Sequence, residues 1–373
     1  MLNKVVAVLD FGSSKLTLLV GHHAVNNNFS ITAYSDIEYA GFMDGEFIEE
    51  DLLFDAVKQA LDEIYSTINQ PLKKIYVGVP GEFCKVENKV ISKNYGKSIR
   101  LNKKKIDQLF FDADKLIMSS SYSVVNIAPV KYVLDGNNET FDPNDCYCKT
   151  IDVNTCFMLA DNRFISLVDR ILKDLGISEV EFVSSTLAEG RYLLDDGLRN
   201  NGALLVDVGY LTTTVAYFSG EGIIEMGCFS MGGAQITADL CEKLNIPFSL
   251  AEQVKQKLLL TIKATGLDAY EVYKGNKIEK VPSLNANEVA LNVIEEILSE
   301  IDKTIENFEE IPIDIHTIYL TGGGLSYLKG IAFIMNKILN KRIEVLKPVP
   351  LKFQKPDLSS AIALLDVTLK MEQ

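Results

Sequence analysis

The sequence predicts an α/β protein made of two similar lobes that face each other across a cleft. The segments VVAVLDFGSSKLTLLV (5–20) and ALLVDVGYLTTTVAYF (203–218) each read as strand, turn, strand. Both turns carry an Asp, a Gly and hydroxyl residues, and a third strand and a helix follow each of them. Because the two Asp residues lie 197 positions apart (207 minus 10), a duplicated domain explains the repeat.

Length and charge support this organisation. A chain of 373 residues exceeds the ~250–300 residues that one hydrophobic core usually serves, so at least two lobes are expected. The formal net charge of −14 argues against nucleic-acid binding, which needs a basic face. We find no apolar run of membrane-spanning length and no signal-peptide pattern, so we expect a cytoplasmic protein. The six cysteines are then expected to be free thiols.

The first part of the first lobe is expected to occupy residues 1–79. Three apolar strands are predicted before an amphipathic helix, and one strand after it. They are the strands Val5–Leu9, Leu16–His22, Phe29–Tyr39 and Lys74–Val79, and the helix Asp51–Ile68.

Residues 80–160 interrupt this pattern, because they are polar and rich in turn signals such as Asp135-Gly136 and Asp142-Pro143. We interpret them as an inserted small α+β module; the alternative is that they continue the first lobe. The elements expected here are a helix at Lys104–Ser119 and strands at Ser123–Leu134 and Lys149–Leu159.

Residues 161–200 are expected to return to the first lobe, and residues 201–356 to form the second, with a smaller subdomain at about 249–310. A last helix, Ser359–Lys370 within 357–373, is expected to pack on the first lobe. Within residues 161–356 we predict helices at Ser166–Leu175, Thr186–Leu194, Gln235–Leu244, Ser249–Lys263, Asn285–Phe308 and Tyr327–Leu339. The strands predicted in the same range are Val180–Val183, Ala203–Val206, Thr212–Phe218, Gly222–Phe229 and Thr317–Leu320.

Several of these segments carry residues suited to phosphate and cation binding. Backbone N–H groups of a glycine turn can hold phosphate oxygens, and an Asp at a strand end can hold a hydrated magnesium ion. Asp10 and Asp207 have this setting, although ordinary hairpins would also explain it. TGGG at 321–324 allows close approach before a helix N-terminus. Glu252 and Lys255 lie three apart, either as a surface pair or as partners for ribose hydroxyls.

Together these segments resemble the superfamily of actin, sugar kinases and DnaK-type chaperones. Within it the chain looks most like FtsA, the bacterial cell-division actin homologue, over nearly its whole length. The matching segments are YVGVPG at Tyr76–Gly81, APVKYVLDGNNETFDP at Ala128–Pro143, MGGAQITADL at Met231–Leu240, AEQVK at Ala251–Lys255 and LTGGGLSYLKGI at Leu320–Ile331.

The resemblance implies duplicated ribonuclease-H-like, actin-like lobes around a nucleotide cleft, with the FtsA-type interaction module inserted in the first lobe. It also implies ATP and Mg²⁺ as ligands. By position, the phosphates would contact Gly12, Ser13, Ser14 and Lys15 from one side and Gly209, Tyr210, Leu211 and Thr212 from the other. The hydrated metal would be held by Asp10 and Asp207, and the ribose would contact Glu252 and Lys255. The adenine would contact Gly322, Gly323, Gly324 and Leu325.

The chain departs from the FtsA pattern at several positions. Tyr210 and Leu211 replace glycines of the second turn, and Thr214 stands where an Asp is common. Ser185 stands where the superfamily usually has a Glu or Gln that orients the attacking water, so we expect at most slow hydrolysis. No catalytic residue is assigned; Glu189, four residues on, is the alternative acid.

The resemblance further implies self-assembly into filaments or dimers, and binding to the FtsZ C-terminal tail and other divisome proteins. FtsA proteins usually end in a linker and an amphipathic membrane helix, whereas this sequence ends at Gln373. We therefore expect a cytoplasmic protein that reaches the inner face of the cell membrane, at the division site, only through partners.

Two other functions remain open at this stage. PilM, the actin-like protein of type IV pilus assembly, lacks such a tail and binds a peptide of a membrane protein. A small-molecule kinase of the same superfamily is the second alternative, although the sequence shows no distinct acceptor-binding motif.

Overall fold

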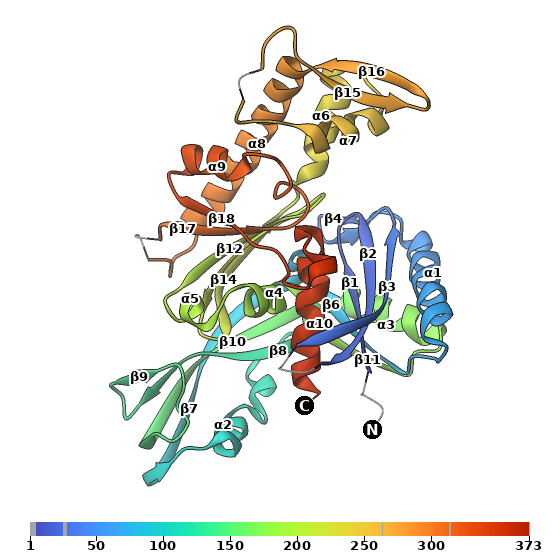
Figure 1. The fold of residues 1–373 in the computed structure, drawn as a ribbon. Coiled ribbons are helices and arrows are strands. Elements are labelled where there is room, and N and C mark those ends of the chain that lie inside the picture. The colour runs from blue at the N-terminus through green and yellow to red at the C-terminus, as the bar shows by residue number, and fades with distance from the viewer. Residues whose placement is uncertain (1–4, 25–27, 263, 313–314, 373) are drawn as a thin grey trace.

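The apolar run that opens the chain forms the central strand of a five-stranded sheet (Figure 1). The computed structural model describes residues 5–24, 28–262, 264–312 and 315–372, so residues 1–4, Lys263 and Gln373 of the predicted ranges lie outside the described residues. The order of the first sheet is β11-β6-β1-β2-β3. Its strands are β1 (Val5–Phe11), β2 (Lys15–His23), β3 (Phe29–Glu38), β6 (Lys74–Val79) and β11 (Glu179–Ser184).

A second five-stranded sheet repeats this topology, in the order β14-β13-β12-β17-β18. In each sheet three antiparallel strands follow one another, and two parallel strands extend the sheet beside the first of them. The predicted pair of similar α/β lobes is therefore confirmed. The strands are β12 (Ala203–Val208), β13 (Thr213–Ser219), β14 (Gly222–Phe229), β17 (Thr317–Thr321) and β18 (Arg342–Val345).

Helices cover both faces of the first sheet. Because side chains alternate along a strand, Ala7 and Leu9 of β1 pack toward α1 (Glu50–Ile68) and α3 (Asn162–Asp174). Val6 and Val8 pack on the opposite face, against α10 (Ser359–Met371). The same alternation places the Asp10 side chain on the face that α10 covers.

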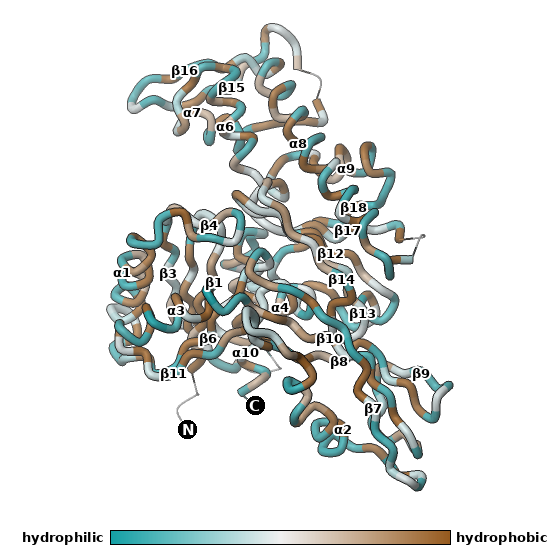
Figure 2. Tube along the Cα trace, turned by 180° about the vertical axis from the view of Figure 1, so that it is seen from behind, coloured by the Kyte–Doolittle hydropathy of each residue, from teal (hydrophilic) through white to brown (hydrophobic). Residues whose placement is uncertain are grey.

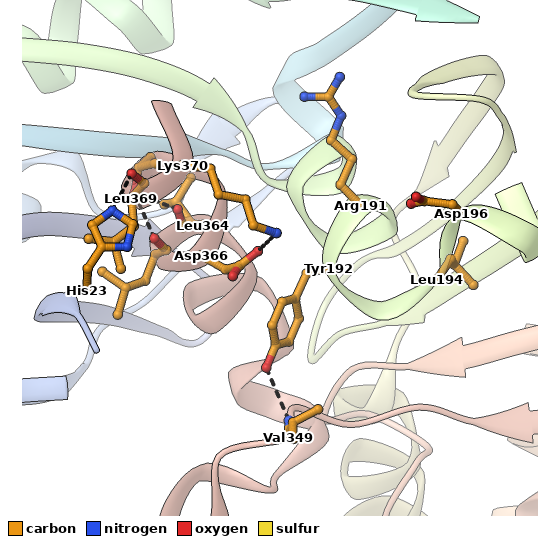
Figure 3. A network of polar contacts seen from close by, with 12 residues as sticks. His23, Arg191, Tyr192, Leu194, Asp196, Val349, Leu364, Asp366, Leu369 and Lys370 are labelled. Atoms are coloured by element: carbon orange, nitrogen blue, oxygen red, sulfur yellow. Dashed lines mark hydrogen bonds and ion pairs between the residues drawn. The ribbon is translucent and has the colours of Figure 1, made fainter. Parts of the chain in front are cut away.

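α10 is buried along most of its length, which explains its continuous apolar sequence. Its C-terminal half is tied to the first lobe where Leu369 O meets a ring nitrogen of His23 at 2.8 Å (Figure 3). The preceding loop is held by Tyr192, whose hydroxyl oxygen accepts from Val349 N at 3.2 Å. The predicted helix at Ser359–Lys370 is confirmed, and it packs on the first lobe as expected.

Within residues 80–160 the chain forms a four-stranded sheet, in the order β7-β10-β8-β9. The predicted helix Lys104–Ser119 is wrong in length: α2 covers Lys103–Phe110, and a 3-10 turn, η2 (Ala113–Leu116), follows. The sequence prediction missed β7 (Cys84–Arg100), since most of its side chains are polar and exposed (Figure 2). The other strands are β8 (Tyr122–Leu134), β9 (Asn138–Thr140) and β10 (Tyr147–Asp161).

In the second lobe, α6 (Gly233–Leu244) and α8 (Ser283–Glu306) match their predictions within two residues. Two predicted helices are too long. The helix Ser249–Lys263 is in fact α7 (Phe248–Lys257), and Pro247 precedes its first residue.

The helix predicted at Tyr327–Leu339 starts only at α9 (Ile331–Leu339), since Gly330 before it has a left-handed φ of 92°. The sequence prediction also missed the hairpin of β15 (Ala269–Lys274) and β16 (Lys277–Pro282), as well as the small hairpin of β4 (Phe42–Met43) and β5 (Glu46–Phe47). The remaining elements are α4 (Ser185–Leu193), α5 (Asp196–Asn200), η1 (Gly81–Phe83), η3 (Leu351–Phe353) and η4 (Pro356–Leu358). None of the helices in the described ranges is long and apolar enough to cross a membrane.

One buried arginine gives a stability test of this fold. Arg199 is 3% exposed, donates to Gly220 O at 2.9 Å and forms an ion pair with Glu221 at 2.5 Å. Arg199→Met leaves the buried Gly220 carbonyl without its partner, so we expect a loss of about 2 kcal/mol in the free energy of unfolding. Urea unfolding followed by circular dichroism measures this loss. Arg163→Met, which removes an exposed ion pair with Asp161, serves as the control and should cost less than about 1 kcal/mol.

Candidate nucleotide and cation site

The two repeated turns have the same backbone geometry. In the first, Gly12 N donates to Lys15 O at 2.9 Å; in the second, Gly209 N donates to Thr212 O at 2.8 Å. Each turn follows a buried strand whose last residues include an Asp. The sequence repeat therefore corresponds to one local structure that is built twice.

The tertiary structure brings these two turns together. Leu211 N of the second turn donates to Ser13 Oγ of the first at 2.9 Å. Asp10 and Asp207 also approach each other, because the charge of Asp10 contributes to the raised pKa of Asp207. The predicted phosphate-binding segments, 12–15 and 209–212, thus lie in direct contact with each other.

Asp10 is almost completely buried and accepts two hydrogen bonds from hydroxyl groups. Ser185 Oγ of α4 donates at 2.9 Å, and Ser360 Oγ of α10 donates at 2.7 Å. Burial raises the pKa of Asp10, while these two hydrogen bonds act in the opposite direction. Ser360 was not predicted as a site residue; the only signal in the sequence is its place at the start of a helix expected to pack on the first lobe.

Glu189 completes a group of three acids. It is 2% exposed, and its Oε1 has no hydrogen-bond partner among the described residues. Burial, then the charges of Asp207 and Asp10, raises its pKa well above the usual range. Burial and Asp10 raise the pKa of Asp207 to about 7. No three His, Cys, Asp or Glu side chains in the described ranges are close enough to ligate one metal ion.

Lys15, a predicted phosphate ligand, lies between two carboxylates. Its Nζ is 2.7 Å from Asp36 Oδ2 and 2.9 Å from Asp357 Oδ2. The other oxygen of Asp357 accepts a hydrogen bond from the Tyr327 hydroxyl. A Cβ atom at Gly323 would lie 2.8 Å from the Cβ of Asp357, so Asp357 covers the glycine turn predicted to face adenine.

The glycines of that turn permit close packing between strands β12 and β17. Gly322 has a φ of +86°, and a Cβ atom there would lie 2.0 Å from Asp207 Oδ1. A Cβ atom at Gly324 would lie 2.2 Å from Gly209 O. Leu325, the last residue predicted to face adenine, is completely buried in the core of the second lobe. Two of the three glycines therefore serve the approach of backbone to backbone, and Gly323 is the one that faces Asp357.

In the predicted ribose pair, Lys255 is buried and Glu252 is partly buried. Lys255 Nζ lies 2.6 Å from Glu252 Oε1 and donates to Thr237 Oγ1 at 2.9 Å. Thr237 Oγ1 in turn donates to Glu252 at 2.7 Å, and Lys255 is 9% exposed. The interpretation as a surface pair is therefore wrong.

Tyr210, which replaces a glycine of the second turn, points toward the same helix. Lys255 Nζ lies 5.2 Å from the centre of the Tyr210 ring, so the ring turns toward α7. Thr214 is buried on β13, and its hydroxyl donates to Cys228 Sγ at 3.6 Å. Thr214 therefore has a partner on the neighbouring strand β14.

Comparisons with known proteins agree with this geometry. The profile of the family described as "Cell division protein FtsA" matches residues 204–363. The Bacillus subtilis (strain 168) cell division protein FtsA is 22% identical over 375 residues, which is 97% of this chain and 83% of that protein. The resemblance to FtsA is confirmed.

Solved structures show that the fold is actin-like. The structure titled "PilM-PilN type IV pilus biogenesis complex" aligns with a TM-score of 0.65 and 18% identity over 98% of each chain. MreB5 of Spiroplasma citri bound to ADP aligns with a TM-score of 0.58 and 13% identity over 99% of this chain and 97% of that one. These identities are too low to carry function, but they confirm two actin-like lobes of the kind that FtsA has.

The contact between the two turns of this FtsA-like chain offers hydrogen-bond donors that fit phosphate oxygens. The backbone N–H groups of Ser13, Ser14 and Tyr210 donate to no acceptor within the described part of the chain, and they flank the contact between the two turns. Phosphate oxygens accept hydrogen bonds from backbone N–H groups of this kind. Glu189 Oε1 is a further polar atom without a partner there. At the adenine end, a base could reach Gly323 only if Asp357 moved.

The raised pKa of Glu189 predicts a pH dependence of stability. The folded state keeps a proton that the unfolded chain releases above about pH 4.3, so this group lowers stability as the pH rises. Glu189→Gln removes that proton release, and its melting temperature should exceed that of the parent by a margin that widens from pH 5 to pH 8. Thermal unfolding across this range measures the margin. A margin that stays constant would show that Glu189 ionises in the folded protein as it does in the unfolded chain.

Proposed function

We propose that this protein is an FtsA-like, actin-fold scaffold of bacterial cell division that binds ATP with Mg²⁺ and hydrolyses it weakly. The observation that carries the proposal is the contact between two glycine turns with unpaired N–H groups, beside Asp10 and Asp207. This arrangement offers donors to phosphates and acids to a hydrated cation in one place. The similarity to FtsA supports the division role.

Each predicted site residue has a role in this proposal. Residues 12–15 and 209–212 hold phosphates from the two lobes, and Asp10 and Asp207 hold the hydrated cation. Lys15 exchanges Asp357 for a phosphate, since it already lies beside Ser13 and Ser14. Glu252 and Lys255 meet the ribose from α7, and residues 322–325 meet the adenine once Asp357 moves. When bound, the cation supplies charge neutralisation for the phosphates.

The proposed partners are the FtsZ C-terminal tail, other division proteins and further copies of this chain. The subdomain at about 249–310 is the proposed docking region for the FtsZ tail. Large apolar side chains are exposed there: Phe248 is 57% exposed, Tyr273 56% and Ile278 55%. The protein would act in the cytoplasm and reach the inner face of the cell membrane, at the septum, through its partners.

A PilM-like adaptor of pilus assembly is the second candidate. It is favoured by the alignment with the PilM-PilN structure, which covers 98% of both chains. The two candidates differ in the peptide that they bind, so peptide binding separates them.

The first prediction concerns the nucleotide. ATP with Mg²⁺ should raise the melting temperature of the protein, because a ligand that binds only the folded state stabilises it. Gly323→Val should abolish the rise by filling the space above the adenine, whereas Gly266→Ala, at a position with no neighbouring atoms within 4 Å, should retain it. The parent protein showing no rise at millimolar ATP would contradict nucleotide binding.

The second prediction concerns FtsZ. A fluorescent FtsZ C-terminal peptide should gain anisotropy on titration with the protein. Tyr273→Ser should weaken this binding by about tenfold, because an exposed aromatic residue of a docking surface often dominates its binding energy. Tyr147→Ser, at an exposed aromatic residue of β10, is the matched control and should bind normally. If the peptide does not bind at high micromolar protein, the PilM-like function becomes the better proposal.

A further inference from the structure

We infer that Glu189 is the side chain that orients the attacking water when this protein hydrolyses ATP. The Ser185 side chain is too short to orient this water, and Glu189 lies one helical turn after it. This inference rests on the proposed nucleotide binding and goes beyond it, because it names the residue on which turnover depends. Three observations on α4 and its surroundings support it.

The first observation is the position of Glu189 on α4. The helix begins at Ser185, and Ser184 caps it by accepting a hydrogen bond from Leu187 N. Residues four apart lie on the same face of a helix, so Glu189 follows Ser185 on the face directed at Asp10. Ser185 Oγ already donates to Asp10 and is committed to that contact. The free carboxyl group on this face is therefore that of Glu189.

The second observation is that Glu189 lacks a structural partner. A buried acid that stabilises a fold is normally paired with a cation or accepts hydrogen bonds, as Asp10 does from Ser185 and Ser360. Glu189 Oε1 has no hydrogen-bond partner among the described residues, and the charges that act on this carboxyl are those of Asp207 and Asp10. Such an arrangement lowers stability, and sites of this kind are typical of function rather than of folding.

The third observation is that the position of Glu189 is fixed by its neighbour. Gly190 lies so close to β13 that a Cβ atom there would be 2.1 Å from the Phe218 ring. This close approach presses α4 against the second lobe at the strand that follows the second phosphate turn. This contact lies at the end of β13 that pairs with Ala203 and fixes α4 against the second lobe, and the charges of Asp207 and Asp10 act on the Glu189 carboxyl.

The chemistry requires only an acceptor at this place. The water oxygen forms a bond to the terminal phosphorus, and the bond from that phosphorus to the bridging oxygen breaks, with its electron pair leaving on ADP. The water gives up its proton to solvent, and inorganic phosphate is released. Glu189 accepts a hydrogen bond from the water and fixes its direction of attack, which is the main contribution a protein group makes beyond charge neutralisation.

The test uses Glu189→Met, which keeps an unbranched side chain but removes the acceptor. Single-turnover hydrolysis should fall by at least about tenfold. The affinity for a fluorescent ATP analogue should stay within about threefold of the parent, since the phosphate turns and Asp10 are unchanged. Glu82→Met is the matched control. Glu82 is also an acid with an unpartnered buried oxygen, but it lies beside Gly45, and its loss should leave turnover unchanged.

A second measurement does not depend on activity. Without nucleotide, Glu189→Met should melt at a higher temperature than the parent, because it removes an unpaired buried carboxyl next to two acids. If Glu189 were purely structural, the variant would melt at a lower temperature and turnover would be unaffected; that result would overturn the inference. Binding of ATP without any turnover in the parent would also overturn it.

Failure of the proposed function gives a different result. A parent protein that binds no ATP removes the nucleotide role and this inference with it. A parent that binds and hydrolyses ATP, with Glu189→Met equally active, removes only the inference. An equal loss of turnover in the Glu82 and Glu189 variants would also count against it, since the effect would not be specific to the cleft.

Discussion

The hydrogen bonds that hold Asp10 connect three distant parts of the chain. Ser185 comes from the end of the first lobe's sheet, and Ser360 comes from the last helix. A buried carboxylate is costly unless it is hydrogen-bonded, so Asp10 requires both helices to be in place. This requirement links the closing helix α10 to the first turn, although 350 residues separate the bonded pair.

Close approach of backbones is the second constraint on the site. The two phosphate turns, the β17 turn and the start of α6 meet with so little space that Gly232, Gly233, Gly322 and Gly324 leave no room for a side chain. Only glycine allows this packing at the base of a cleft. Tyr210 is accommodated because its ring lies beside Lys255 of α7.

The same cleft contains groups that favour function and oppose stability. Glu189 Oε1 is buried without a hydrogen-bond partner among the described residues, and Lys15 is held by two carboxylates. Asp357 joins Lys15 to the glycine turn at 323, so the first turn and the turn after β17 are connected through one residue. Local arrangements of this kind are usually retained for binding or catalysis, since folding alone would not select them.

The sequence by itself determined the two lobes and the acids at their strand ends. Apolar strands with a period of two, and two matching turns around Asp10 and Asp207, depend on local chemistry that a sequence displays. The polar strand β7 and the hairpin β15–β16 escaped prediction, because pairing with a neighbouring strand stabilises them more than their own composition does. Only the tertiary structure showed that Ser360 holds Asp10, that Asp357 covers Gly323 and that Glu189 faces the two acids. Each of these contacts joins segments far apart in the chain, and long-range contacts are decided by packing, which no local pattern encodes.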